Sequence, residues 1–146
     1  MNYWIFPGIT NFNKFEYDEL VVSKRFDSLK ELEKTLLESS YTEYIINICQ
    51  KIFEVKDIKS IKRSRELTEA RFASWYLMKK ILLMTYMKIG RVYRKDHSTI
   101  IHGVKEHDNL YEYTIEYRTR FNDARNLLIN KMKRDDEAKE RISNKQ

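Results

Sequence analysis

The stretch TYMKIGRVYRKDHSTIIHGV, residues 85–104, decides the fold predicted for this chain of 146 residues. Thr85 can cap a short helix that runs to about Tyr93, because its hydroxyl can accept a hydrogen bond from a free amide at the helix start. The next two residues form a tight turn, and a further helix begins at Asp96 or its neighbour. Residues 63–104 therefore have the form of a helix-turn-helix: a short helix, a turn and a second helix that opens with small polar residues.

Helical spacing of apolar residues continues on both sides of this stretch. It predicts helices that begin near Ser28, that run from Thr42 to about Phe53, and that run from about Glu69 to Met84. Three glycines and one proline are too few for folds built on many tight turns. We predict an all-α fold with a helix-turn-helix core. We divide the chain into an N-terminal extension (residues 1–41), a helix-turn-helix domain (residues 42–110), and a C-terminal helix with a charged tail (residues 111–146).

A seven-residue rhythm follows the core, in alternating steps of four and three residues: Leu110, Thr114, Tyr117, Phe121, Ala124 and Leu128. It predicts one long helix whose seam packs on another helix. Because the rhythm lasts only about two and a half heptads, packing against the chain's own domain is the default. The alternative is a homodimer through the C-terminal helix. Residues 131–146 are almost wholly charged and polar, and we expect them to fray.

Positive charge is concentrated in the middle of the chain. The net charge is +6, and residues 56–105 carry 13 basic groups against 4 acidic groups, whereas residues 1–55 carry 6 against 9 and residues 106–146 carry 9 of each. Such an asymmetry is typical of a folded surface that meets a polyanion such as nucleic acid. A solvated basic face is the competing interpretation, and charge alone does not separate the two.

Several classes of protein and site are disfavoured. Cys49 is the single cysteine, so no internal disulfide and no multi-cysteine zinc site can form, and its apolar neighbours predict a buried thiol. His102 is expected to be structural and His107 to face solvent, with no metal site among the histidines. We find no signal peptide and no apolar run of membrane-spanning length, so we expect no membrane association and a cytoplasmic location.

Two polar clusters flank the middle of the chain. Asp96, His97, Ser98 and Thr99 open a helix and can exchange hydrogen bonds with base edges. A basic run lies before and at the start of the helix expected from about Glu69, and consists of Lys62, Arg63, Arg65 and Arg71. In a helix-turn-helix protein the second helix enters the major groove by its N-terminus. The alternative interpretations need no DNA: Asp96 would only cap the helix, and the basic run would only face solvent.

The chain resembles, at these residues, the carboxy-terminal DNA-binding domain of the bacterial replication initiator DnaA, a Trp-repressor-like helix-turn-helix. The resemblance rests on the basic Arg63-Ser64-Arg65, on Ile89-Gly90, and on the Asp96–His102 block that matches the family pattern D-H-[ST]-T-[VI]-x-H. It covers about residues 42–110. The turn before Asp96 differs, because it is one residue tighter than in the family and lacks glycine.

The resemblance implies double-stranded DNA as the partner and a short element, the DnaA box, as the target. Arg63 matches the arginine that enters the minor groove, with Arg65 on the same loop. Lys79 matches a lysine that contacts phosphate. Asp96, His97 and Ser98 match residues that meet bases in the major groove, with Thr99 beside them. Apart from the resemblance, the charge of Lys95 in the turn predicts a further phosphate contact. We therefore expect Arg63, Arg65, Lys79, Lys95, Asp96, His97, Ser98 and Thr99 to bind DNA.

No G-x-x-x-x-G-K phosphate loop occurs in the sequence, so we expect no ATP binding, no cofactor and no catalysis. The chain resembles a stand-alone form of the DNA-binding domain, of bacterial, phage or mobile-element origin, that regulates replication initiation or transcription. The alternative is a protein-interaction module on the same scaffold, which would use the 110–128 seam. A nuclease is disfavoured, because the four acidic residues of the basic middle show no evident pairing.

Overall fold

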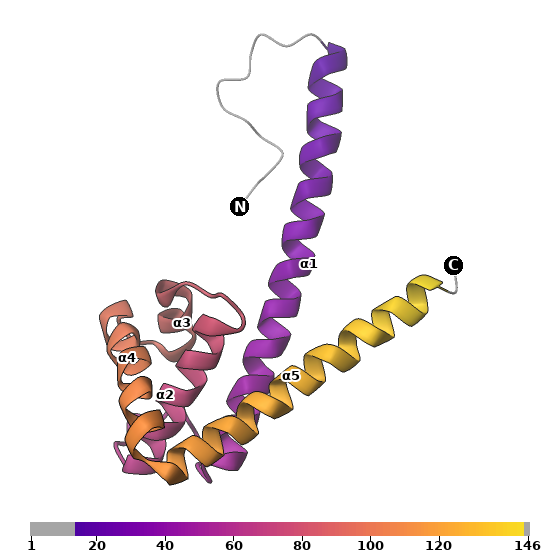
Figure 1. Ribbon diagram of the computed structural model, residues 1–146. Coiled ribbons are helices and arrows are strands. Elements are labelled where there is room, and N and C mark those ends of the chain that lie inside the picture. The colour runs from indigo at the N-terminus through magenta and orange to yellow at the C-terminus, as the bar shows by residue number, and fades with distance from the viewer. Residues whose placement is uncertain (1–13, 145–146) are drawn as a thin grey trace. The chain divides into compact units, whose positions relative to one another are not determined.

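The computed structural model describes the backbone of residues 14–144 and the side chains of residues 30–144. Every regular element of this part of the chain is a helix (Figure 1). The all-α prediction is therefore confirmed. The five described helices are α1 (Lys14–Ile52), α2 (Arg65–Lys80), α3 (Tyr86–Tyr93), α4 (His97–Tyr113) and α5 (Ile115–Asn144). None of them is long and apolar enough to cross a membrane.

Helix α1 is a single element of 39 residues where the sequence predicted two shorter helices. It begins at Lys14 instead of near Ser28, and it continues through residues 39–41 without a break. No Pro or Gly interrupts the chain between residues 9 and 89, and serine costs little inside a helix. Backbone preference therefore extends the helix beyond the apolar pattern on which the prediction rested.

The chain divides into two units between Ser40 and Tyr41, and the helix-turn-helix lies wholly in the second. Residues 1–13 of the predicted N-terminal extension lie outside the described residues. The predicted boundaries at residues 41 and 110 stay predictions, although side chains of α5 contribute to the same core as the helix-turn-helix.

Trp75 lies at the centre of the core of the second unit. Its ring is 2% exposed and meets Tyr93 edge-on, with the two ring centroids 5.6 Å apart. The Tyr93 hydroxyl lies 2.7 Å from the Ser74 hydroxyl, which gives this buried phenol a polar partner. Burial raises the pKa of the Cys49 thiol to about 12, so the predicted buried cysteine is confirmed. All five helices contribute to the core, for example through Ile45, Leu77, Ile89, Ile100 and Phe121.

Polar caps set where α2 and α3 begin. The Ser64 hydroxyl accepts a hydrogen bond from the Leu67 amide at 3.2 Å, and Thr85 does the same for Lys88 at 3.2 Å. The helix predicted from Thr85 to Tyr93 is confirmed. The predicted bounds of the helix from Glu69 to Met84 were wrong at both ends. The cap at Ser64 starts α2 earlier, at Arg65, and α2 ends at Lys80. The backbone that follows becomes left-handed at Leu83, with a φ of 56°.

The predicted long helix from Leu110 is broken at Thr114, whose extended backbone separates α4 from α5. The seam residues of α5 are nevertheless buried in their own domain, which was the default interpretation: Tyr117, Phe121, Ala124 and Leu128. These four residues therefore offer no surface to a partner, and an interaction module that uses Tyr117 or Phe121 is not supported. A homodimer through other residues of α5 stays a prediction. The predicted fraying was wrong up to Asn144, which is helical.

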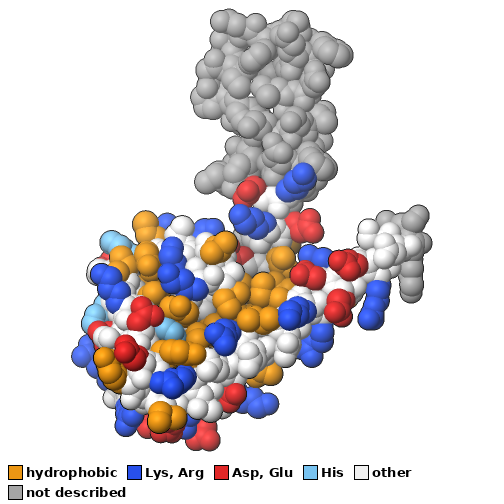
Figure 2. All heavy atoms as spheres, viewed as in Figure 1, with side chains coloured by type: hydrophobic (Ala, Val, Ile, Leu, Met, Phe, Trp, Pro, Cys, Tyr) orange, Lys and Arg blue, Asp and Glu red, His pale blue; other side chains and the backbone are white. Residues whose placement is uncertain are grey.

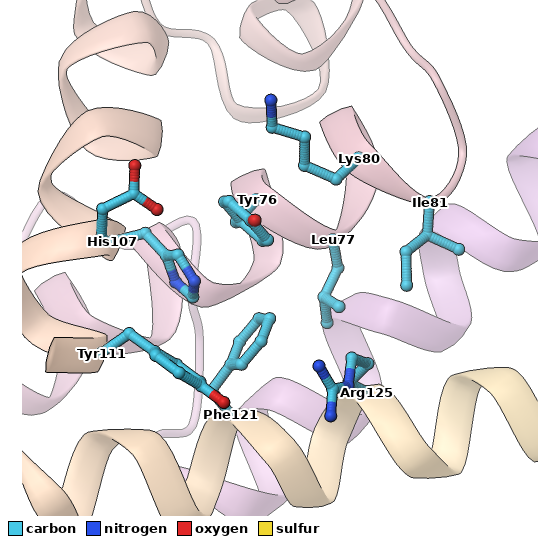
Figure 3. A pocket seen from close by; sticks show the side chains of 9 residues that line it. Tyr76, Leu77, Lys80, Ile81, His107, Tyr111, Phe121 and Arg125 are labelled. Carbon is cyan, nitrogen blue, oxygen red and sulfur yellow. The ribbon is translucent and has the colours of Figure 1, made fainter.

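His107 is buried at 2% exposure, so the expectation that it faces solvent was wrong. Its ring stacks on Tyr76 with a centroid distance of 3.7 Å, and its Nδ1 lies 2.6 Å from the Tyr117 hydroxyl. Figure 3 shows the imidazole facing Tyr76, with Tyr111 and Phe121 nearby, beside a cavity of about 380 Å³. Burial lowers the pKa of His107 to about 4, against a small opposing effect of Asp108.

This buried histidine predicts a loss of stability in mild acid. Between pH 6.5 and about 4 the unfolded chain binds a proton at residue 107 that the folded chain does not. The free energy of unfolding should fall as the pH falls through this window, by up to about 3 kcal/mol. Urea unfolding at several values between pH 7 and pH 5 measures the slope.

His107→Gln should flatten that slope, because neither the folded nor the unfolded chain then binds a proton at residue 107. His102→Gln, which replaces an exposed histidine, is the matched control. An equal slope in the wild type and in His107→Gln would contradict the assignment.

Candidate nucleic-acid interface

The turn between α3 and α4 is closed by backbone contacts. Arg94 ends α3 in the left-handed conformation, with a φ of 55°, and the Lys95 amide donates to the Gly90 carbonyl at 2.9 Å. A Cβ on Gly90 would lie 2.5 Å from the Lys95 carbonyl oxygen. The turn therefore requires glycine at residue 90. Its left-handed position is occupied by Arg94, although glycine is the residue that favours this conformation.

The polar run from Asp96 to Thr99 is exposed at the start of α4. Asp96 is the N-cap residue, but its side chain forms no capping hydrogen bond. One carboxylate oxygen accepts a short hydrogen bond from the Ser98 hydroxyl, and the other lies 3.3 Å from Nδ1 of His97. The Ser98 bond, with a smaller effect of His97, lowers the pKa of Asp96. The run thus presents an ionised carboxylate, an imidazole and a hydroxyl fixed to one another.

The basic loop, residues 58–64, leads into α2. Arg63 is exposed, and Arg65 is the first residue of α2, with Nε 3.2 Å from Oε1 of Glu69. Because this pair lies on one helix and Arg65 is largely exposed, the contact orients the guanidinium more than it stabilises the fold.

Arg63 and Arg65 border the face of α4 on which Ser98 lies. Ser98, His102 and Glu106 follow one another at four-residue spacing, so they share that face. The His102 ring meets Phe72 of α2 edge-on, with centroids 6.2 Å apart. A hollow of about 400 Å³ adjoins Glu106 and is lined by residues of the loop and of both helices, including Arg63, Arg65, Phe72 and Leu110. Arg63 and Arg65 thus border α4 about two turns, or roughly 12 Å, beyond Ser98.

Further cations surround the turn. A second hollow, of about 410 Å³, is lined by Arg91, Arg94, Lys95, Asp96 and His97, together with Met87 and Gly90. In Figure 2, Lys and Arg side chains are spread over the helix-turn-helix part of the molecule, with acidic side chains among them. The arrangement can offer hydrogen bonds to base edges from one helix end and positive charge to phosphates on both sides of it.

A family model described as "Bacterial dnaA protein helix-turn-helix" matches residues 42–106. Residues 42–106 belong to the DnaA helix-turn-helix family. The chain is 31% identical over 111 residues to the chromosomal replication initiator protein DnaA of Geobacter metallireducens, which covers 71% of this chain and 25% of the relative. It is 30% identical over 116 residues to the DnaA of Campylobacter concisus, which covers 77% of this chain and 27% of the relative. The chain thus spans about a quarter of the length of these relatives.

Lys79 lies at the opposite end of α2 from Arg65 in the DnaA-type domain. It belongs to the last turn of α2, and its Nζ lies 4.3 Å from the centre of the Tyr86 ring at the start of α3. The structure thus brings Asp96–Thr99 together with Lys95, brings Arg63 together with Arg65, and leaves Lys79 at a third position.

Arg71 was grouped with the exposed basic run, and this interpretation was wrong. The residue is buried in the DnaA-type domain, at 7% exposure. Its guanidinium donates to the carbonyls of Ile58 at 2.8 Å and Lys62 at 3.2 Å, and makes a short hydrogen bond to the carbonyl of Ser60. Arg71 thereby holds the backbone of the basic loop. Its sequence position, between buried Ala70 and Ser74 of α2, is the signal that could have identified it.

Helix-cap geometry in this DnaA-type turn gives a pair of opposite predictions. Gly90→Ala should lower the free energy of unfolding by roughly 1–3 kcal/mol, because the new Cβ collides with the Lys95 carbonyl. Arg94→Gly should raise it by up to about 1 kcal/mol, because glycine adopts the left-handed conformation without strain. Thermal and urea unfolding of both variants test the pair, and a stable Gly90→Ala would show that the turn is not closed in this way.

Proposed function

We propose that the chain binds double-stranded DNA with sequence preference, with the start of α4 in the major groove and the basic loop in the adjacent minor groove. The observation that carries the proposal is that the exposed run Asp96–Thr99 opens the same helix whose Glu106 and Leu110 adjoin Arg63 and Arg65. A single duplex can meet both clusters, because both lie along α4.

The polar run has the chemistry for reading bases. Asp96, ionised because its pKa is lowered, can accept a hydrogen bond from the amino group of cytosine. His97 can exchange hydrogen bonds with base edges, and the methyl of Thr99 can pack on that of thymine. Because Asp96 already bonds to Ser98 and contacts His97, less side-chain freedom is lost on binding.

The cations have the chemistry for the backbone and the minor groove. Arg63 is exposed and suits the narrow, strongly negative minor groove of A·T-rich DNA. Arg65 and Lys79 are held beside Glu69 and Tyr86 and can contact phosphates, as can Lys95 in the turn. These contacts release counterions, so affinity should fall as salt rises.

The match of residues 42–106 to the DnaA helix-turn-helix model supports a DnaA box as the target, and the named relatives are chromosomal replication initiators. We propose that the chain regulates replication initiation or transcription at such a site. The proposal contains no catalytic step and no ATP.

Fluorescence anisotropy with a DnaA-box duplex and a scrambled duplex tests the proposal. The box duplex should bind more tightly at every salt concentration. His97→Ala should weaken box binding roughly 5- to 100-fold and reduce the preference, because a base contact is lost. Lys95→Ala should weaken binding to both duplexes alike and reduce the salt slope by about 1, because a phosphate contact is lost.

Arg134→Ala is the matched control, because it removes an exposed arginine from the far part of α5. Its affinities should equal those of the wild type. Equal affinity of the wild type for the two duplexes would refute sequence preference, and no binding at low salt would refute the proposed function as a whole.

A further inference from the structure

Ile61 is the most exposed large apolar side chain in the described part of the chain, at 95%. It lies within the basic loop, between Ser60 and Lys62, and two residues before Arg63. One exposed isoleucine needs no explanation by itself. Its position is unusual because the loop that carries it is firmly held and because cationic residues surround it in sequence.

The backbone on both sides of Ile61 is fixed. Arg71 donates to the carbonyls of Ser60 and Lys62, the residues before and after it. The Lys62 amide donates to the Ser60 hydroxyl at 3.1 Å, and the Ser60 amide donates to the Asp57 carbonyl at 3.1 Å. Ile58, three residues earlier, is fully buried and anchors the loop in the core. The loop therefore buries Ile58 in the core and exposes Ile61 to solvent.

We propose that Ile61 is an apolar wedge that enters the minor groove beside Arg63 and bends the duplex. This inference rests on the proposed function. Proteins that bind the minor groove combine arginine with apolar side chains that partly unstack a base step and bend the DNA. Arg63 supplies the cation and Ile61 the apolar side chain. Because Arg71 already fixes the loop, little backbone entropy is lost when the wedge enters the groove.

The test measures bending and affinity together, by energy transfer between dyes at the two ends of a DnaA-box duplex and by anisotropy. Ile61→Ala should reduce the bend angle by at least about 20° and weaken binding roughly 5- to 20-fold. Its salt slope should equal that of the wild type, because no phosphate contact is lost. Ile61→Leu should retain the bend. Ile142→Ala, which removes an exposed isoleucine from the last turns of α5, is the matched control and should change neither quantity.

Ile61→Lys separates an apolar wedge from a general contact with DNA. It should steepen the salt slope, because it adds a cation, without restoring the bend. If the wild type binds the duplex and Ile61→Ala binds and bends it equally, the wedge is refuted while the proposed function stands; an apolar contact with a protein would give this result. If the wild type binds no duplex, the proposed function fails and the wedge fails with it.

Discussion

The close contact between α4 and α2 at Gly103 is the constraint on which the rest of the structure depends. A Cβ at residue 103 would lie 2.4 Å from the ring of Trp75, so only glycine lets the two helices approach this closely. Ile100, Val104 and His107 are buried together with Gly103. This contact fixes the rotation of α4 about its axis and leaves Ser98 and His102 on the outside.

The helix-turn-helix could be predicted from the sequence because its signals are local. Thr85 caps α3 by a hydrogen bond to the Lys88 amide, and Asp96 occupies the N-cap position of α4, so both signals lie within a few residues of the helix starts. The exposed run that opens at Asp96 follows from the same local pattern. The placement of Arg63 on the side of α4 that carries Ser98 does not, because it depends on how α2 packs against α4.

The predictions that were wrong concern long-range contacts and weak patterns. His107 has charged neighbours in sequence, yet Tyr76 and Tyr117 come from other helices to bury it. The sequence predicts Arg71 to be a surface cation, but its guanidinium donates to carbonyls of the basic loop. Helix α1 extends to Lys14 through a region without clear apolar spacing. His107 and Arg71 are placed by partners that neighbouring sequence does not reveal, whereas α1 is extended by backbone preference.

An NMR titration of the labelled protein with one DnaA-box duplex tests most directly whether the basic loop and the polar run Asp96–Thr99 bind the same duplex. The amide resonances of residues 59–65 and of residues 96–99 should shift together and saturate at the same ratio of duplex to protein. Shifts confined to one of these segments, or centred on α5, would contradict a single duplex held by both.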